Sequence, residues 1–191
     1  MCNLRFRSAT LSEHYLYFSA GVDQRIQNDF VAYLVGLQIA GATKLTIALS
    51  SPGGNVVAGV TIYNTLISMP YEIETHNIGN SDSIATVIFL AGKKRFANPT
   101  ATFMFHGVGF DGNAAERLEE KNLLEKLDVV KSEHKRIASL IEAGSKIKAA
   151  DCVKLLENQS TRDAVWAEAV GLIGGIKVFS VPQGANVKYL I

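Results

Sequence analysis

Residues 79–84, Gly-Asn-Ser-Asp-Ser-Ile, form a small-residue turn between two apolar runs, and the interpretation of the whole chain depends on this stretch. The run before it, 71–78, is typical of a strand, and the run after it, 84–91, is compatible with a helix. A serine at such a junction is well placed to act as a nucleophile, because the N–H groups of the helix N-terminus lie nearby and bind negative charge. The alternative for Ser83 or Asp82 is a helix N-cap, which is the commoner role of these residue types.

Length and composition narrow the class of protein. The chain has 191 residues, a net charge of +1 and 48% hydrophobic residues, so overall charge gives no indication of nucleic-acid or acidic-lipid binding. No apolar stretch approaches the length of a bilayer span, and the N-terminus lacks the apolar core of a signal peptide. The two cysteines, Cys2 and Cys152, make neither a disulfide framework nor a metal cluster. We expect a single domain over residues 1–191, a cytoplasmic location, and no metal, cofactor, membrane or nucleic acid.

Strand-like and helix-like segments alternate through the first half of the chain. The expected segments are a strand at 14–19, a helix capped by Asp23, a strand at 44–49, a helix at 56–67, and strands at 73–78 and 101–105. This alternation predicts an α/β fold with a mostly parallel sheet. Ligands of such sheets bind at the carboxyl ends of the strands.

Three chemically suggestive features directly follow predicted strands: residues 51–54 (Ser-Pro-Gly-Gly), Ser83 and His106. A nucleophilic serine needs a base and donors for the oxyanion. His106 is the best-placed base among the four histidines, and the N–H groups of Gly54 and Ile84 are candidate oxyanion donors. The alternative is a chance coincidence, because loops of α/β proteins are rich in glycine and serine.

A long helix is expected from about residue 114 to residue 143. Its apolar seam has alternating spacings of four and three and consists of Leu123, Leu127, Val130, His134, Ile137 and Ile141. A helix of about 30 residues extends about 45 Å, which exceeds what a domain of this size needs. We therefore expect a partner surface for the seam, in the same chain or in a neighbouring subunit, and interpret His134 as a packed or interface histidine.

Taken in order, these segments resemble the proteolytic subunit of the Clp protease. Residues 51–63 are similar to the glycine loop and following helix of that family, and 79–85 resemble its Gly-x-x-x-Ser elbow, which puts the nucleophile at Ser83 rather than Ser81. Residues 94–106 are similar to the segment that carries the catalytic histidine. The long helix matches the handle through which two subunit rings meet, and 167–173 are similar to the end of the family pattern.

The resemblance implies a ClpP/crotonase-like fold of stacked β-α-β units, with a mostly parallel sheet and a protruding handle helix at about 114–143. It also implies a serine endopeptidase that cleaves peptides or unfolded proteins within a homo-oligomeric ring or stacked rings. Ser83 would be the nucleophile and His106 the base, with oxyanion roles for Gly54 and Ile84 and no cofactor.

Three features depart from the family pattern. Asp82 adds a carboxylate beside the nucleophile, where it would oppose an oxyanion if it pointed inward. The chain begins almost at the first strand, which argues against docking to an ATPase unfoldase. The acid of the triad is open: Asp163 follows an arginine as in the family, but an ungapped alignment back from Gly171 puts Asp163 at a helix cap and Gln159 in the place of the acid.

Other functions are compatible with parts of the pattern. The chain could be a catalytically weak or inactive ring subunit that keeps the fold for assembly. It could be a crotonase-type acyl-CoA enzyme, which needs no nucleophile and so leaves Ser83 and His106 unexplained. A signal-peptide peptidase with a Ser-Lys dyad is disfavoured by His106 and by the lack of an apolar span.

Overall fold

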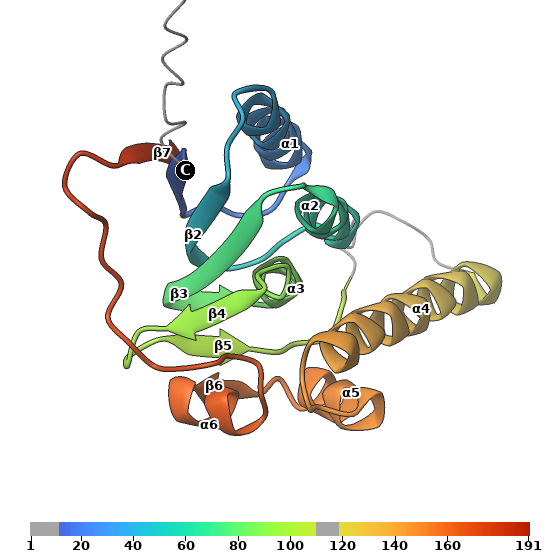
Figure 1. Ribbon diagram of the computed structural model, residues 1–191. Coiled ribbons are helices and arrows are strands. Elements are labelled where there is room, and N and C mark those ends of the chain that lie inside the picture. Colours follow the sequence, from blue (N-terminus) through green and yellow to red (C-terminus); the bar gives the residue numbers. More distant parts are fainter. Residues whose placement is uncertain (1–11, 110–118) are drawn as a thin grey trace, which may run out of the picture.

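The computed structural model describes residues 12–109 and 119–191, which form an α/β fold (Figure 1). The strands are β1 (Glu13–Phe18), β2 (Lys44–Ser51), β3 (Glu72–Asp82), β4 (Lys94–Ala97), β5 (Thr102–Met104), β6 (Thr161–Asp163) and β7 (Asn186–Leu190). The helices are α1 (Gln24–Ile39), α2 (Val56–Ser68), α3 (Ile84–Phe89), α4 (Glu120–Gly144), α5 (Ala149–Glu157) and α6 (Ala164–Ala169).

The strands form one sheet in the order β6-β5-β3-β2-β1-β7, and β4 also pairs with β3. The pairing is parallel throughout except between β5 and β6, which are antiparallel. Helices α1, α2 and α3 cover one face of this sheet, and the segment that leads to β7 crosses the other face (Figure 1). The predicted α/β fold with a mostly parallel sheet is therefore confirmed.

The main difference from the sequence prediction concerns the stretch before Ser83. Residues 79–82, expected to be a turn, continue β3, because 80–82 pair with 102–104 of β5. Gly79 fits this strand because a Cβ there would lie 2.7 Å from Ser50 Oγ. The short strands β4 and β6 were not predicted, because their few residues take an extended form through pairing with neighbouring strands rather than through their own composition.

Helix starts follow the predicted capping chemistry. Asp23 Oδ1 accepts a hydrogen bond from the N–H of Ile26 at 2.7 Å, as expected, and Asn55 Oδ1 accepts one from the N–H of Ala58 at 2.9 Å. These caps satisfy N–H groups that have no partner within the helix.

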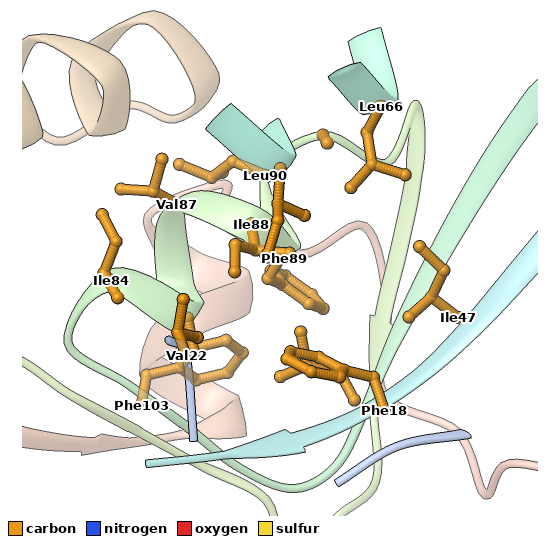
Figure 2. Close-up of a cluster of buried hydrophobic side chains, with 14 of the residues drawn as sticks. Phe18, Val22, Ile47, Leu66, Ile84, Val87, Ile88, Phe89, Leu90 and Phe103 are labelled. Carbon is orange, nitrogen blue, oxygen red and sulfur yellow. The ribbon is translucent and has the colours of Figure 1, made fainter. Parts of the chain in front are cut away.

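The core lies between the sheet and the three covering helices, and α3 is buried on every side (Figure 2). Ile84 at its start contacts α2 so closely that a Cβ on Gly59 would lie 2.3 Å from Ile84 Cγ1. The rings of Phe89 and Phe103 meet edge to face, with centroids 5.4 Å apart. The helix that follows Ser83 is too short to be stable alone, so it is packing against its surroundings that stabilises it.

The long helix α4 has two different halves. Its C-terminal half contacts the body of the protein through Ile137, Ala138 and Ile141, which are buried. Its N-terminal half projects from the body (Figure 1), and Leu123 and Leu127 of the predicted seam are 51% and 47% exposed there. The long helix is confirmed, and residues 114–118 of its expected range lie outside the described residues.

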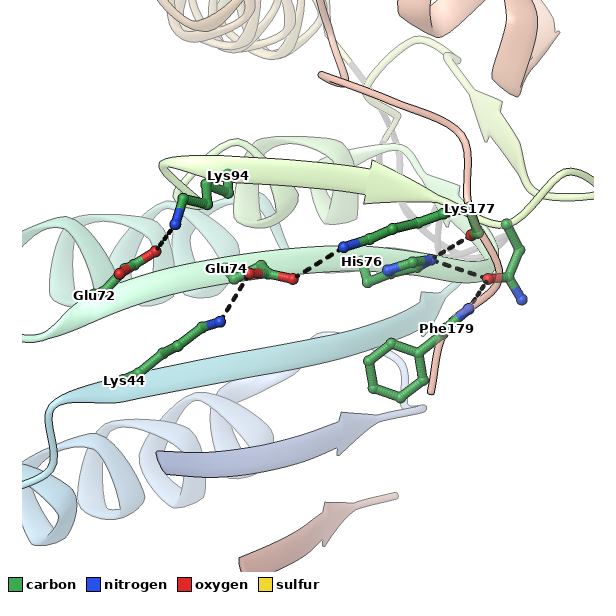
Figure 3. A network of polar contacts seen from close by, with 8 residues as sticks. Lys44, Glu72, Glu74, His76, Lys94, Lys177 and Phe179 are labelled. Carbon is green, nitrogen blue, oxygen red and sulfur yellow. Dashed lines mark hydrogen bonds and ion pairs between the residues drawn. The ribbon is translucent and has the colours of Figure 1, made fainter. Parts of the chain in front are cut away.

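A polar network holds the C-terminal segment against the open face of the sheet (Figure 3). Glu74 lies between Lys44 and Lys177, at 3.0 and 3.7 Å from their ammonium nitrogens. Beside it, His76 Nε2 lies 3.0 Å from both Asn98 Oδ1 and the Lys177 carbonyl oxygen. Both partners are acceptors, so this nitrogen carries the proton. Burial lowers the pKa of His76 from its ordinary value, and this effect exceeds the opposing effect of its hydrogen bonds.

The contact between α2 and α3 gives a stability prediction. Replacement Gly59→Ala should lower the free energy of unfolding by about 1–3 kcal/mol, because the added methyl overlaps Ile84. The matched control is Gly36→Ala on α1, where nothing lies within 4 Å of the new Cβ. There the change should raise stability by about 0.5–1 kcal/mol. Denaturant unfolding measures both, and equal effects of the two changes would contradict this packing.

The buried His76 gives a pH prediction. In the unfolded chain, the His76 side chain takes up a proton near pH 6.5. In the folded chain it resists protonation, because burial lowers the pKa of His76. Unfolding free energy should therefore fall as pH drops below about 6.5. His76→Gln retains an N–H donor and does not titrate, so its stability should depend less on pH between about 6.5 and 5. The prediction would be refuted if the unfolding free energies of the two proteins fell equally with pH across this range.

Candidate active site

The elbow at Ser83 connects β3 directly to α3. Ser83 has φ 55° and ψ −127°, a left-handed conformation that residues other than glycine rarely adopt. Its N–H donates to the carbonyl of Met104 at 2.7 Å. Ser83 occupies the N-cap position of α3, but its side chain makes no capping hydrogen bond. The hydroxyl therefore does not perform the usual function of a cap.

The glycine loop after β2 lies directly against this elbow. A Cβ on Gly53 would lie 2.5 Å from the Asp82 carbonyl oxygen and 2.9 Å from Ser83 Cβ. Gly53 also has φ 80°, so both its backbone conformation and its surroundings exclude a side chain. Residues 51–54 and Ser83, which the sequence analysis expected at one sheet edge, are thus in contact.

Two backbone donors near Ser83 are free. In the bridge between Val22 and Gly54, the Val22 N–H donates to the Gly53 carbonyl at 2.8 Å and the Val22 carbonyl accepts from Asn55 at 2.7 Å. The N–H of Gly54 therefore points away from Val22, and within the described part of the chain it has no hydrogen-bond partner. The same holds for the N–H of Ile84. Free N–H groups beside a serine hydroxyl are what an oxyanion hole requires.

His106 lies at the same edge of the sheet as Ser83. It follows Met104 by two residues, and the Met104 carbonyl accepts the N–H of Ser83. His106 Nδ1 lies 2.8 Å from the carbonyl oxygen of Gly107. A carbonyl can only accept, so Nδ1 carries a proton, and in the neutral ring it is then Nε2 that has the lone pair. No hydrogen bond joins Ser83 Oγ to His106 in the described structure.

The antiparallel pairing of β5 with β6 determines which residues lie beside the strand that leads to His106. The N–H of Phe105 donates to the Ser160 carbonyl at 2.9 Å, one residue beyond the paired strands. Gln159 precedes Ser160 by one residue and lies outside the paired strands. Gln159 is exposed, with φ 48°.

Asp163 lies elsewhere. It pairs with Thr102, four residues before His106, which is about 13 Å along an extended chain. Its Oδ1 accepts a hydrogen bond from the N–H of Trp166 at 2.8 Å, and this bond caps α6. The structure therefore brings together residues 51–54, Ser83 and His106, but not Asp163.

The residues just before Ser83 differ in accessibility. Asp82 Oδ2 accepts from Asn80 Nδ2 at 2.6 Å, and Asn80 Oδ1 in turn accepts from Ser50 Oγ at 2.7 Å. Asp82 is therefore held on the face of β3 that also carries Asn80, as side-chain alternation requires. Ser81 points to the other face, has 0% exposed area, and its hydroxyl has no partner.

His134 on α4, for which the sequence pattern indicates no site role, lies close to the candidate site. Its Nε2 accepts a hydrogen bond from the N–H of Val108 at 2.8 Å, so it contacts the segment that follows His106. The seam pattern predicts a packed or interface histidine at this position, but a pattern of spacing cannot identify which backbone group lies opposite.

Over the described residues, no group of three or more His, Cys, Asp or Glu side chains is arranged to hold a metal ion. None of the described helices is both long and apolar enough to cross a membrane.

Curated relatives resemble this chain over part of its length. It is 34% identical over 111 residues to the ATP-dependent Clp protease proteolytic subunit 2 of Corynebacterium glutamicum, which is 56% of this chain and 55% of that protein. It is 32% identical over 111 residues to proteolytic subunit 1 of Mycobacterium bovis, with 56% of each chain covered. The matched segment thus spans little more than half the length of these relatives.

A solved structure and a family model match a larger part of this chain than these relatives do. A point mutant of ClpP1 from Listeria monocytogenes has the same fold, with a TM-score of 0.77 and 20% identity over 86% of this chain and 91% of that one. The family model described as Clp protease matches residues 3–178. The chain therefore belongs to the Clp protease family.

Proposed function

We propose that this chain is a serine peptidase subunit that cleaves peptide bonds in peptides or unfolded proteins. The observation that carries the proposal is the elbow at Ser83, where a strained backbone presents a hydroxyl that does not cap α3. Strained conformations of this kind are concentrated at functional sites. The relatives named proteolytic subunits of the Clp protease support the same reaction class.

In the proposed reaction, His106 Nε2 takes the proton of Ser83 as the hydroxyl oxygen attacks the peptide carbonyl carbon. The N–H groups of Gly54 and Ile84 stabilise the developing oxyanion. His106 then gives its proton to the leaving amine, which yields an acyl-enzyme. Water attacks this ester with His106 again as the base, and Ser83 is regenerated. The contact of Nδ1 with a carbonyl supports the first step, because in the neutral ring it favours the tautomer whose Nε2 accepts a proton.

We also propose that the subunits assemble into rings, and that two rings meet through α4. The exposed side chains Leu123, Leu124 and Leu127 support this, since apolar side chains gathered on a projecting half-helix favour a protein partner.

A ring subunit with weak or no activity is the second candidate. The contact of His106 Nδ1 with a backbone carbonyl rather than a carboxylate favours it, because a neutral partner stabilises an imidazolium less well than a carboxylate does. The carboxylate of Asp82 next to the nucleophile favours it too.

Labelling with a fluorophosphonate probe distinguishes these two functions. We expect the wild-type protein to be labelled at Ser83, and Ser83→Ala to lose both labelling and peptidase activity, by more than about a thousandfold. The matched control is Ser81→Ala, which removes a buried hydroxyl without a partner and should be labelled like the wild type. A folded wild-type protein that resists the probe, while a control hydrolase reacts, would favour the inactive subunit.

The capping bond of Asp163 gives a prediction about the third catalytic position. Asp163→Ala should lower the unfolding free energy by about 1 kcal/mol, through loss of the cap on α6. Its labelling rate should not change. Asp163→Asn retains the cap and should match the wild type in both stability and labelling rate. If Asp163→Asn instead slowed labelling about a hundredfold at unchanged stability, Asp163 would be the acid and the assignment as a cap only would fail.

A further inference from the structure

One peptide unit connects the two histidines on either side of the segment after β5. The carbonyl oxygen of Gly107 lies 2.8 Å from His106 Nδ1. The next N–H, that of Val108, donates to His134 Nε2 at 2.8 Å. These two groups belong to the same peptide bond, whose C=O and N–H point in opposite directions. The atoms are thus arranged in series, from His106 through the peptide bond to His134.

The protonation states in this series are fixed by the partners. His106 must carry its proton on Nδ1, because a carbonyl oxygen only accepts. His134 must be unprotonated at Nε2, because a backbone N–H only donates. The two bonds reinforce each other, since an N–H that donates polarises its own carbonyl and makes that oxygen a better acceptor.

The surroundings hold this segment from both sides. Ahead of His106, the N–H of Phe105 is bonded to Ser160, and the Phe105 ring meets Trp166 edge to face, with centroids 5.8 Å apart. Behind it, the chain passes so close to α4 that a Cβ on Gly107 would lie 3.3 Å from His134 Nε2. The bond from Val108 to His134 ties this segment to α4.

We infer that His134 is a positioning residue for the proposed reaction, and that it acts through the Gly107–Val108 peptide to orient His106. In a Ser-His-Asp triad, a carboxylate holds the histidine in the correct tautomer and orientation. In the proposed arrangement, the Gly107–Val108 peptide has this role. The inference rests on the proposed function, because it concerns the base of that reaction. It explains how His106 is oriented although Asp163 caps α6.

The test compares two replacements of His134 in the full chain, by the rate of reaction with a fluorophosphonate probe. His134→Leu removes the hydrogen-bond acceptor but still fills the space between α4 and the body with a side chain. The maximal labelling rate should fall about tenfold, the effect of losing one hydrogen bond. The probe concentration for half-maximal rate should change little, because His134 does not contact the probe. His134→Gln can again accept from Val108 and should restore most of the rate.

The control variant is Lys135→Gln, an exposed neighbour on the same helix, which should behave like the wild type. Thermal unfolding of each variant separates loss of orientation from loss of structure. If His134→Leu does not fold, His134→Asn replaces it, because its shorter amide does not reach Val108. Wild-type labelling rates in a folded variant that lacks the acceptor would overturn the inference, as would a Gln variant no faster than the Leu variant. Failure of the wild type itself to react would instead refute the proposed function.

Discussion

The left-handed backbone at Ser83 is the constraint on which the site depends. A residue with a Cβ in this region raises the free energy by about 1–2 kcal/mol, so the surrounding structure has to hold it there. The N–H of Ser83 is bonded to Met104 at the end of β5, and Thr86 Oγ1 donates to the Ser81 carbonyl on the other side of the elbow. The buried side chain of Ile84, packed against Gly59, fixes the helix that follows. Elements from distant parts of the sequence thus maintain one unfavourable conformation.

This constraint also explains the glycine loop. The strand-to-helix turn projects the Ser83 Cβ toward the loop after β2, and only a residue without a side chain can lie against it. The loop is in turn paired with Val22, between β1 and α1. Three β-α connections therefore meet at the carboxyl edge of one parallel sheet, which is where such sheets place their ligands.

Much of this arrangement could be predicted from the sequence. The alternation of segments predicted the parallel sheet, and Asp23 marked the start of α1 because capping follows local rules. The convergence of residues 51–54, Ser83 and His106 followed from strand direction alone. The extension of β3 to Asp82 could not be predicted, because it depends on pairing with β5, and the small residues of that stretch also suit a turn.

The partner of His106 was beyond prediction for a related reason. An arginine-aspartate pair at 162–163 suggests an acid, but only the register of β5 with β6 shows that Asp163 faces Thr102. The bond to His134 depends on how α4 packs on the body, a contact between residues 26 positions apart.

The orientation of His106 by a peptide rather than a carboxylate has a physical consequence for the whole molecule. A carboxylate on a rigid strand would stabilise the imidazolium by its own charge, whereas a neutral peptide contributes about half as much and does so only where its position is fixed. That position depends on α4, whose C-terminal half is held to the body by Ile137 and Ile141. Packing of these apolar side chains thus helps to determine where His134 lies, and under the proposed role of His134 it also bears on the orientation of His106. The proposed orientation of His106 is therefore coupled to helix packing, whereas a carboxylate beside the ring would act on it directly.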